Sequence, residues 1–286
     1  MKIETKPLPP GLYLVSTPIG SARDITLRAL DVLASADLIA AEDTRTARKL
    51  LEIHGVPLGG RQILSHHDHS GMAGVNGLVA LMREGKSLAY VSEAGTPMIA
   101  DPGFELGRAA IAEGIAITAV PGVSAAITAL TVTGLPTDQF HFVGFLPTSQ
   151  AQRQAAIADL RDVPGTLVFY ESPKRIDELL NTLAEGLGQG RQAAICRELT
   201  KKFEEVRRGT IGALIGGLED LTRKGEFVVC VGKAGEAEVS EAEIIAALED
   251  ALKTMRVKDA ATAVAGAHGL PRRQVYQIAL ELGKKR

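Results

Sequence analysis

The chain has 286 residues, of which 45% are hydrophobic and 23% are charged, as is usual for a globular protein with a substantial core. Its formal net charge of −2 disfavours a protein that binds nucleic acid through overall positive charge, and no apolar run is long enough to span a membrane. The first ten residues lack the apolar stretch of a signal peptide, so we expect a cytoplasmic protein.

The first half of the chain alternates short apolar runs with segments of helical periodicity. Strands are predicted at residues 12–15, 37–41, 62–64, 87–91 and 115–120, and helices at residues 26–34, 46–53, 75–83, 104–112 and 123–132. Strands that alternate with helices predict a parallel sheet covered by helices on both faces. The Gly-x-Gly-x-x-Gly fingerprint of dinucleotide-binding folds does not follow the first strand.

A second α/β domain is predicted after the Gly-Leu-Pro sequence at residues 134–136, which is typical of a hinge. Strands are predicted at residues 140–145, 166–170, 193–197, 204–208 and 227–231, and helices at residues 150–160 and 176–184. Two of these strands have no helix between them, so the second sheet is expected to be mixed. Cys196 and Cys230 lie in two of the strands; we expect reduced, buried thiols, although a disulfide is possible if those strands are adjacent.

The end of the chain is rich in Ala, Glu and Leu and predicts helices at residues 240–255, 259–267 and 271–282. The last two, separated by a Gly-containing turn, have the helix-turn-helix pattern. From Lys253 onward there are eight basic and two acidic residues, which suits a surface that binds nucleic acid. The alternative is a solvated helical cap. The predicted domains are therefore residues 1–133, 134–235 and 236–286.

The stretch from Val91 to Gly103 is the centre of the first domain. It follows an apolar strand and contains two glycines that can take positive φ, two prolines that stiffen the turn, and the carboxylates of Glu93 and Asp101. Open α/β sheets bind ligands at the carboxyl ends of their strands, which is where this stretch lies. The alternative is an ordinary loop between a strand and a helix.

Seven short motifs occur along the chain in the order found in one protein family. They are Thr17-Pro18-Ile19-Gly20, Ala41-Glu42-Asp43-Thr44-Arg45, Ala94-Gly95-Thr96-Pro97 with Asp101-Pro102-Gly103, Pro121-Gly122-Val123-Ser124-Ala125, Gly144-Phe145-Leu146-Pro147, Tyr170-Glu171-Ser172-Pro173 and Arg197-Glu198-Leu199-Thr200-Lys201. On these motifs the chain resembles the bacterial small-subunit ribosomal RNA methyltransferases that modify a cytidine ribose, a branch of the tetrapyrrole-methylase superfamily. Ser21-Ala22 and Glu93 depart from the family, which usually has Asn-Leu and Asp there.

The resemblance implies two α/β domains with S-adenosylmethionine bound in the cleft between them. It implies that the cofactor-binding residues are Pro18, Glu93, Gly95, Ile99, Asp101, Ser124, Ala125, Leu146, Tyr170 and Cys230. Ser124 and Ala125 open a predicted helix, whose free N–H groups can bind the methionine carboxylate. A helix-capping role alone is the alternative for Ser124.

Methyl transfer from a sulfonium needs no metal, and catalysis is mostly alignment of the acceptor about 3–3.5 Å from the methyl group. A base that deprotonates the acceptor hydroxyl would help. The candidate catalytic cluster is Glu42, Asp43, Arg45, His69 and Glu171. The candidate RNA-binding residues are Arg45, Lys174, Arg175, Lys201, Arg272 and Arg273. For each of these the alternative is an ordinary surface ion pair.

A cluster of histidines, His66, His67 and His69 with Asp68, suggests a metal site. Neighbouring residues of a strand point to opposite faces, so only His67 and His69 can share one face. Two ligands do not make a zinc site, and no third is evident. We therefore expect no metal.

The resemblance predicts an S-adenosylmethionine-dependent enzyme that methylates the ribose 2′-hydroxyl of a cytidine in the decoding region of small-subunit ribosomal RNA. Its substrate would be that RNA or the assembled 30S subunit, and the resemblance also suggests a homodimer. Two alternatives stay open. One is a small-molecule methyltransferase that acts on a tetrapyrrole, and the other is a non-enzymatic, ligand-sensing protein that binds nucleic acid.

Overall fold

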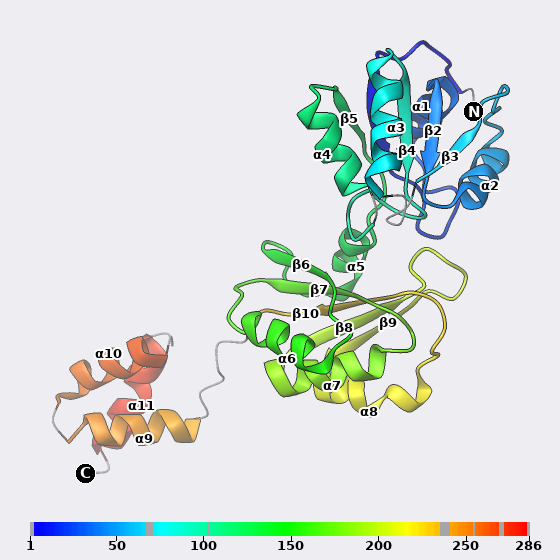
Figure 1. Ribbon diagram of the computed structural model, residues 1–286. Helices are drawn as coiled ribbons and strands as arrows, with labels where there is room; N and C mark the ends of the chain where they lie inside the picture. The colour runs from blue at the N-terminus through cyan, green and yellow to red at the C-terminus, as the bar shows by residue number, and fades with distance from the viewer. Residues whose placement is uncertain are drawn as a thin grey trace. The chain divides into compact units, whose positions relative to one another are not determined.

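The computed structural model describes residues 3–66, 71–101, 103–234, 241–253, 255–268 and 272–284. The chain divides into two units, one of residues 1–161 and 165–232 and one of residues 162–164 and 233–286. The first unit holds two five-stranded sheets, and the second holds a group of helices (Figure 1). Because both sheets fall in one unit, the division into residues 1–133, 134–235 and 236–286 stays a prediction.

The first sheet is parallel and has the strand order β3-β2-β4-β1-β5. Its strands are β1 (Gly11–Val15), β2 (Leu38–Ala41), β3 (Ile63–Ser65), β4 (Ser87–Val91) and β5 (Ile117–Val120). The intervening helices are α1 (Leu27–Ser35), α2 (Thr44–His54), α3 (Gly71–Arg83) and α4 (Phe104–Ala112). All five strands run the same way, so the loops that follow β1, β4 and β5 emerge side by side at one edge.

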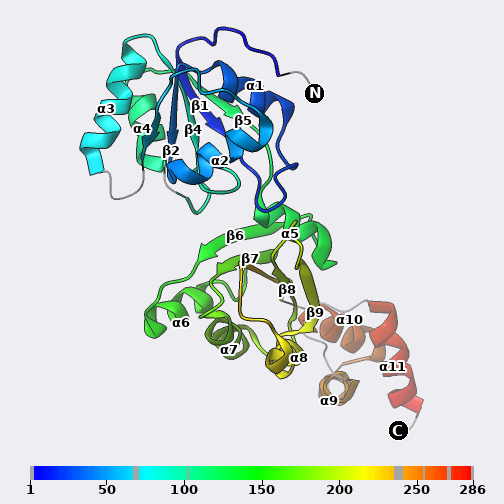
Figure 2. The same ribbon diagram turned by 90° about the vertical axis from the view of Figure 1, so that its right-hand side faces the viewer.

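Helices cover both faces of this sheet, as predicted (Figure 2). Residues of β4 alternate between the two faces, with Ala89 and Val91 packed in the cluster of α1 and α2. Leu88 and Tyr90 belong to the opposite cluster, which includes residues of α3 and α4. Near-continuous apolar strands are what a sheet buried on both faces requires.

The second sheet is mixed, as predicted, with the order β6-β7-β10-β8-β9. Its strands are β6 (Phe140–Phe145), β7 (Thr166–Glu171), β8 (Gln192–Arg197), β9 (Glu205–Thr210) and β10 (Phe227–Val231). Only β6 and β7 pair in parallel, and the other three pairs are antiparallel.

Helices lie on both faces of the second sheet as well (Figures 1 and 2). One face carries α6 (Gln150–Asp159), α7 (Ile176–Leu187) and α8 (Ile211–Gly216), the last of which the sequence analysis did not predict. The other face is covered by α5 (Ala125–Thr133), whose Ala126, Ala129 and Leu130 pack in the same cluster as Cys230. Helix α5 thus follows a strand of the first sheet but buries its apolar side against the second.

Cys196 and Cys230 lie on the adjacent strands β8 and β10, and both are buried free thiols. Burial raises the pKa of Cys196 to about 12 and that of Cys230 further, so neither forms a thiolate readily near neutral pH. The expectation of reduced, buried thiols is confirmed, and the alternative of a disulfide is not.

The second unit contains α9 (Glu241–Ala251), α10 (Val257–His268) and α11 (Arg272–Lys284). The three helices share a core of their own, which includes Leu248, Ala261 and Val275. Most of the turn predicted between α10 and α11 lies outside the described residues. Within the described part of the chain, no helix has the length and apolarity needed to cross a membrane.

Candidate functional site

A cavity of 540 Å³ lies in the first unit, where the loops of the parallel sheet meet the second sheet. Its volume falls in the range of small-molecule sites. The parallel-sheet side of the lining comprises residues 18–20, 93–96, 99–101 and 124–125, with Thr46. The opposite side comprises Phe145, residues 170–173 and 225–228, and Lys201.

The loops after β1, β4 and β5 are bonded into one wall of the cavity. Thr17 and Gly95 exchange backbone hydrogen bonds of 2.8 and 3.0 Å, so the first loop is joined to the second. The Thr96 hydroxyl then donates to the Val123 carbonyl at 3.0 Å, which joins the second loop to the third. These bonds hold the carboxyl ends of three neighbouring strands in a fixed relation.

The loop after β4 has a strained backbone where it lines the cavity. Met98 and Ala100 have φ values of 72° and 60°, in the left-handed region that side chains other than glycine rarely occupy. Such strain persists only where the surroundings impose it, and it is concentrated at functional sites. Here the strained pair flanks Ile99 and precedes Asp101, both of which line the cavity.

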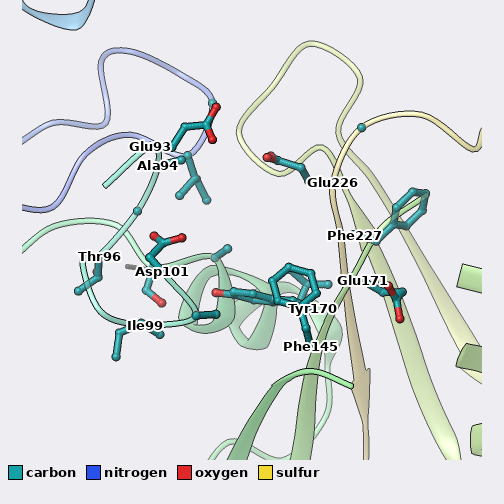
Figure 3. Close-up of a pocket in the computed structure, with 18 of the residues that line it drawn as sticks. Glu93, Ala94, Thr96, Ile99, Asp101, Phe145, Tyr170, Glu171, Glu226 and Phe227 are labelled. Carbon is teal, nitrogen blue, oxygen red and sulfur yellow. The ribbon is translucent and has the colours of Figure 1, made fainter. Parts of the chain in front are cut away.

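Carboxylates converge on the cavity from both sides. Figure 3 shows those of Glu93 and Asp101 on one loop and that of Glu226 opposite them, facing the same space. Burial is the largest cause that raises the pKa of Asp101 to about 6, followed by the negative charge of Glu42, with smaller effects from Glu93 and Glu226. A hydrogen bond from Ser92 opposes these effects.

Tyr170 forms the floor of the cavity in this view (Figure 3). Its hydroxyl oxygen accepts a 3.0 Å hydrogen bond from the Ala126 N–H at the start of α5, and its ring meets that of Phe145 edge-on at 5.7 Å between centroids. Burial raises the pKa of Tyr170, so the phenol stays protonated. The Ser124 hydroxyl makes no capping bond to α5, although Ser124 occupies the N-cap position, so capping alone does not account for this side chain.

Lys201 brings positive charge to the rim. Its ammonium group lies 2.7 Å from carboxylate oxygens of both Glu198 and Glu226. Burial by itself lowers the pKa of Lys201, but these two ion pairs raise it by more. The side chain therefore remains charged while it links the turn after β8 to the segment before β10.

Most of the residues proposed for cofactor binding line this one cavity. They are Pro18, Glu93, Gly95, Ile99, Asp101, Ser124, Ala125 and Tyr170. Leu146 and Cys230 are not among the lining residues: the Leu146 carbonyl accepts a bond from Arg175, and Cys230 is fully buried within β10. The structure thus brings eight of the ten together, while the role of each stays a prediction.

The candidate catalytic cluster does not gather in the cavity. Asp43 is the N-cap of α2 and binds the exposed Arg45 at 2.8 Å, and neither residue lines the cavity. Glu42 also lies outside the lining, although its carboxylate accepts a 3.4 Å bond from the Glu93 N–H. Glu171 does line the cavity, but its carboxylate is buried against Arg175 and the Ser172 N–H. His69 lies outside the described residues.

The candidate RNA-binding residues occupy different settings. Lys174 is exposed just beyond the cavity-lining Pro173, whereas Arg175 donates to the carbonyls of Leu146 and Pro147. Arg272 and Arg273 are exposed in the first turn of α11, in the second unit. Arg175 therefore has a structural role, whereas Lys174, Arg272 and Arg273 present their charge to solvent.

Several lining residues were not singled out from the sequence. Phe145 belongs to a recognised motif without having been assigned a role, and Glu226, Phe227 and Val228 belong to no motif. The last three line the cavity because β10 runs antiparallel to β7, which places Phe227 opposite Glu171. No local signal in the sequence specifies that pairing.

No group of three or more metal-ligating side chains occurs among the residues that the structure describes. His67, His69 and Asp68, on which the metal hypothesis rested, lie outside that part of the chain. The expectation that the protein needs no metal stays a prediction.

Comparison with known proteins gives two family matches. Residues 11–215 match the family described as Tetrapyrrole (Corrin/Porphyrin) Methylases. Residues 238–283 match the family described as the RsmI C-terminal HTH domain. The first match includes the parallel sheet and the second sheet except β10, and the second match includes α9, α10 and all but the last residue of α11.

Among individual proteins, the chain is 46% identical to the ribosomal RNA small subunit methyltransferase I of Mesorhizobium japonicum, over 98% of this chain and 95% of that protein. A crystal structure of the uroporphyrin-III-C-methyltransferase from Thermus thermophilus is 27% identical, with a TM-score of 0.55, and covers 78% of this chain and 94% of that one. A structure of a Thermus thermophilus uroporphyrin-III C-methyltransferase with bound S-adenosylhomocysteine has the same fold, with a TM-score of 0.54 and 17% identity over 78% of this chain and 98% of that one.

Proposed function

The chain belongs to the ribosomal RNA small subunit methyltransferase I family within the tetrapyrrole methylases, and from this membership we propose that it methylates small-subunit ribosomal RNA with S-adenosylmethionine. The observation that carries the proposal is the cavity in the first unit. Its volume suits a small molecule, loops joined by hydrogen bonds form one of its walls, and several carboxylates line it.

The residues of the cavity fit S-adenosylmethionine. At Gly95, with φ of 81°, the chain has no side chain, so its backbone is open to a ligand. Glu93, Asp101 and Glu226 give the cavity negative potential, which complements the positive charges of the cofactor's sulfonium and amino groups. Ser124 and Ala125 at the start of α5 supply backbone N–H groups for its carboxylate.

We expect the eight cofactor-binding candidates that line the cavity to hold the cofactor, with Tyr170 and Phe145 supplying aromatic surface for its adenine. Bound there, S-adenosylmethionine supplies an activated methyl group on a positively charged sulfur. The task of the protein is then to exclude water, to align the acceptor and to receive its proton. Each of these tasks can be carried out by side chains already in the lining.

The proposed acceptor is the ribose 2′-hydroxyl of a cytidine in the decoding region, as the family resemblance implies. Lys174 and Lys201 lie at or beside the cavity and are candidates to bind the phosphates that flank this nucleotide, and the exposed Arg45 is a further candidate. Arg272 and Arg273 on α11 would add contacts from the helix-turn-helix unit.

Three properties of the assembly are part of the same proposal. The substrate would be the ribosomal RNA or the assembled small subunit, and the site of action would be the cytoplasm, where that substrate is made. We also expect a homodimer, which light scattering coupled to size-exclusion chromatography would test.

A direct test supplies the purified protein with methyl-labelled S-adenosylmethionine and one of three acceptors: small ribosomal subunits, free small-subunit RNA or a tetrapyrrole. We expect label in ribosomal RNA, recovered as 2′-O-methylcytidine after digestion and mass spectrometry. Label on the tetrapyrrole alone would revive the small-molecule alternative. Tight cofactor binding without transfer to any acceptor would favour a ligand-sensing protein.

A further inference from the structure

The loop of residues 198–204 joins β8 to β9 (Figure 1), and its Lys201 lines the cavity. Two residues further along the chain, Phe203 is 63% exposed. Two residues of extended chain span at most about 7 Å, so Phe203 lies beside the cavity although it is not one of the lining residues. The molecule therefore presents an uncovered aromatic ring next to the site proposed for methyl transfer.

The backbone of this loop is strained and held by hydrogen bonds. Glu198 and Thr200 have φ values of 52° and 64°, in the left-handed region. The Thr200 N–H donates to the Glu204 carboxylate at 2.6 Å, and the Thr200 hydroxyl accepts the Ser21 N–H at 3.0 Å. Such conformations persist where the surroundings impose them, and they are concentrated at functional sites. A loop fixed in this way presents Phe203 to a partner with little entropy left to lose on binding.

The cation beside the ring is open to a partner of opposite charge. The Lys202 ammonium group lies over the Phe203 ring, 5.5 Å from its centre, and Lys202 is exposed. Lys202 makes no ion pair within the part of the chain that the structure describes, whereas the Glu205 carboxylate is neutralised by Arg197 and Arg207. An aromatic ring with an adjacent cation suits single-stranded nucleic acid, because nucleobases stack on the ring and phosphates pair with the cation.

A single exposed phenylalanine is common on protein surfaces and needs no function. Phe140, for example, is 45% exposed at the start of β6. It lies five residues before the cavity-lining Phe145, which is about 16 Å along a strand that rises about 3.3 Å per residue. Phe203 is distinguished by the combination of a fixed loop, an adjacent cation and a position beside the cavity.

The cavity itself explains why RNA would need an aromatic surface at this place. A volume of 540 Å³ that also holds the cofactor has no room for several stacked nucleotides. A nucleotide whose ribose enters the cavity must therefore separate from a neighbour in the RNA, and that neighbour loses a stacking partner. Proteins that recognise unstacked RNA commonly replace such a partner with an aromatic side chain.

We propose that Phe203 and Lys202 form a platform for the RNA strand beside the target nucleotide. The Phe203 ring stacks on a nucleobase next to that nucleotide, and Lys202 binds a phosphate of the same strand. The inference rests on the proposed methylation of ribosomal RNA and extends it, since it assigns a nucleotide-binding surface outside the cavity.

Phe203→Leu removes the ring and keeps an apolar side chain, whereas Phe203→Tyr keeps the ring. We expect Phe203→Leu to weaken binding to small ribosomal subunits, measured by co-sedimentation, by about 5- to 150-fold, the range of one lost stack between a nucleobase and an aromatic ring. Phe203→Tyr should restore most of that affinity. Calorimetry should show unchanged affinity for S-adenosylmethionine in both variants, because Phe203 does not line the cavity.

Phe140→Leu is the matched control, since it removes an exposed phenylalanine far from the cavity lining. It should bind subunits as the wild type does. Wild-type affinity in Phe203→Leu, or an equal loss in Phe140→Leu, would overturn the proposal. A lower molar mass of Phe203→Leu in light scattering would overturn it as well, because the ring would then lie between two copies of the chain.

A fluorescent reporter tests the stacking directly. The chain contains no tryptophan, so Phe203→Trp and Phe140→Trp each introduce a single one. We expect single-stranded RNA of decoding-region sequence to quench the emission of Phe203→Trp and to leave that of Phe140→Trp unchanged. The RNA is added at concentrations where the anisotropy of a labelled copy shows that it is bound. Unchanged emission from Phe203→Trp with bound RNA would overturn the proposal.

Lys202→Gln tests the phosphate contact. The slope of log affinity for subunits against log salt concentration should become shallower by about 0.7–0.9, the effect of one phosphate. An unchanged slope would remove Lys202 from the platform. If the wild-type protein transfers no methyl group to ribosomal RNA, the proposed function fails; if it does transfer one and Phe203→Leu binds and methylates subunits like the wild type, only this inference fails.

Discussion

Backbone strain marks the cavity at the scale of single residues. Among the described residues, those other than glycine with positive φ are Met98, Ala100, Glu198 and Thr200. The first two belong to the loop after β4, and the other two lie within the three residues before Lys201, which lines the opposite wall. Both walls thus carry conformations that an unconstrained loop would avoid, which is the pattern expected of a binding site that is shaped before its ligand arrives.

Gly95→Val is expected to abolish most cofactor binding. Gly95 has φ of 81°, and a Cβ there would lie 3.4 Å from the Ile19 side chain, so the branched side chain of valine would be both strained and crowded. Calorimetry should show affinity for S-adenosylmethionine reduced more than about tenfold, the factor that ~1.4 kcal/mol produces.

Gly114→Val is the matched control for this experiment. Gly114 has a similar φ of 68°, but nothing lies within 4 Å of its Cβ position, and it does not line the cavity. Both variants should lose about 1–2 kcal/mol of stability to the left-handed conformation, and only the first should lose affinity. Equal affinities in the two variants would remove the loop after β4 from the cofactor site.

At the scale of elements, Asp43 determines where α2 begins. Its carboxylate accepts bonds from the N–H groups of Arg45 and Thr46 and pairs with the Arg45 guanidinium, and the side-chain bond to Arg45 is the main reason that its pKa falls to about 2. The motif that suggested catalysis therefore has a helix-capping role at this position.

Asp43→Ala should lower the melting temperature at pH 7, while Asp43→Asn, which keeps a capping oxygen, should lower it less. A carboxylate whose pKa is depressed stabilises the fold above its unfolded pKa near 4, and that contribution is lost as the pH falls toward 2. The difference between wild type and Asp43→Ala should accordingly shrink below about pH 4. A difference that is constant from pH 7 to pH 3 would contradict the electrostatic part of this account.

The loop after β1 contacts the turn after β8, and this contact joins the two walls of the cavity. The Ser21 N–H donates to the Thr200 hydroxyl at 3.0 Å. A Cβ at the neighbouring Gly20 would lie 2.5 Å from the Lys201 side chain and 3.0 Å from the Leu199 carbonyl. The last residue of the Thr-Pro-Ile-Gly motif is therefore a glycine because backbone approaches backbone there.

Gly20→Ala should lower the free energy of unfolding by about 1–3 kcal/mol, the usual cost of overpacking, and should weaken cofactor binding by spreading the walls. Gly77→Ala provides the comparison, because Gly77 lies in α3 with nothing within 4 Å of its Cβ position. That substitution should stabilise the protein by about 0.5–1 kcal/mol. Chemical denaturation measures the free energy of unfolding of both variants, which should fall for Gly20→Ala and rise for Gly77→Ala. A Gly20→Ala protein as stable as the wild type would show that the two walls can relax around the added methyl group.

Charge is distributed unevenly at the scale of the whole molecule. The segment from Lys253 to the end carries a formal charge of +6, and with a chain total of −2 the remainder carries −8. The electrostatic attraction to RNA should therefore come mainly from the second unit and from local groups such as Lys174 and Lys201. Helix α11 is the place to test this, because Arg272 and Arg273 are exposed in its first turn.

A double variant, Arg272→Gln with Arg273→Gln, should weaken binding to small ribosomal subunits. The slope of log affinity against log salt concentration should become shallower by about 0.7–0.9 for each phosphate that the protein no longer neutralises. Cofactor affinity should not change, since every lining residue of the cavity belongs to the first unit. The control is Arg83→Gln with Lys86→Gln, which removes two exposed charges, one at the end of α3 and one in the turn before β4. If both double variants retain the wild-type salt slope, α11 does not bind RNA and the second unit is a structural cap.

The sequence by itself determined all five strands of each sheet, most of the helices and the two kinds of sheet. Apolar runs of strand length alternate with helical periodicity, and these local patterns survive in the fold because both faces of each sheet must be buried. The motifs at strand ends also led to most of the lining residues, because parallel strands bring their carboxyl ends to one edge. Gly95, Asp101 and Ser124 could be selected on this basis without a structure.

Tertiary structure decided the rest. Glu226 and Phe227 reach the cavity only because β10 pairs antiparallel with β7, and α5 covers the second sheet although it follows a strand of the first. The setting of Asp101 depends on Glu42 and Glu226, which come from separate parts of the chain. Burial and charge act through space, whereas the sequence shows only which residues are neighbours along the chain. The raised pKa of Asp101 and the cavity wall supplied by the second sheet therefore depend on the fold.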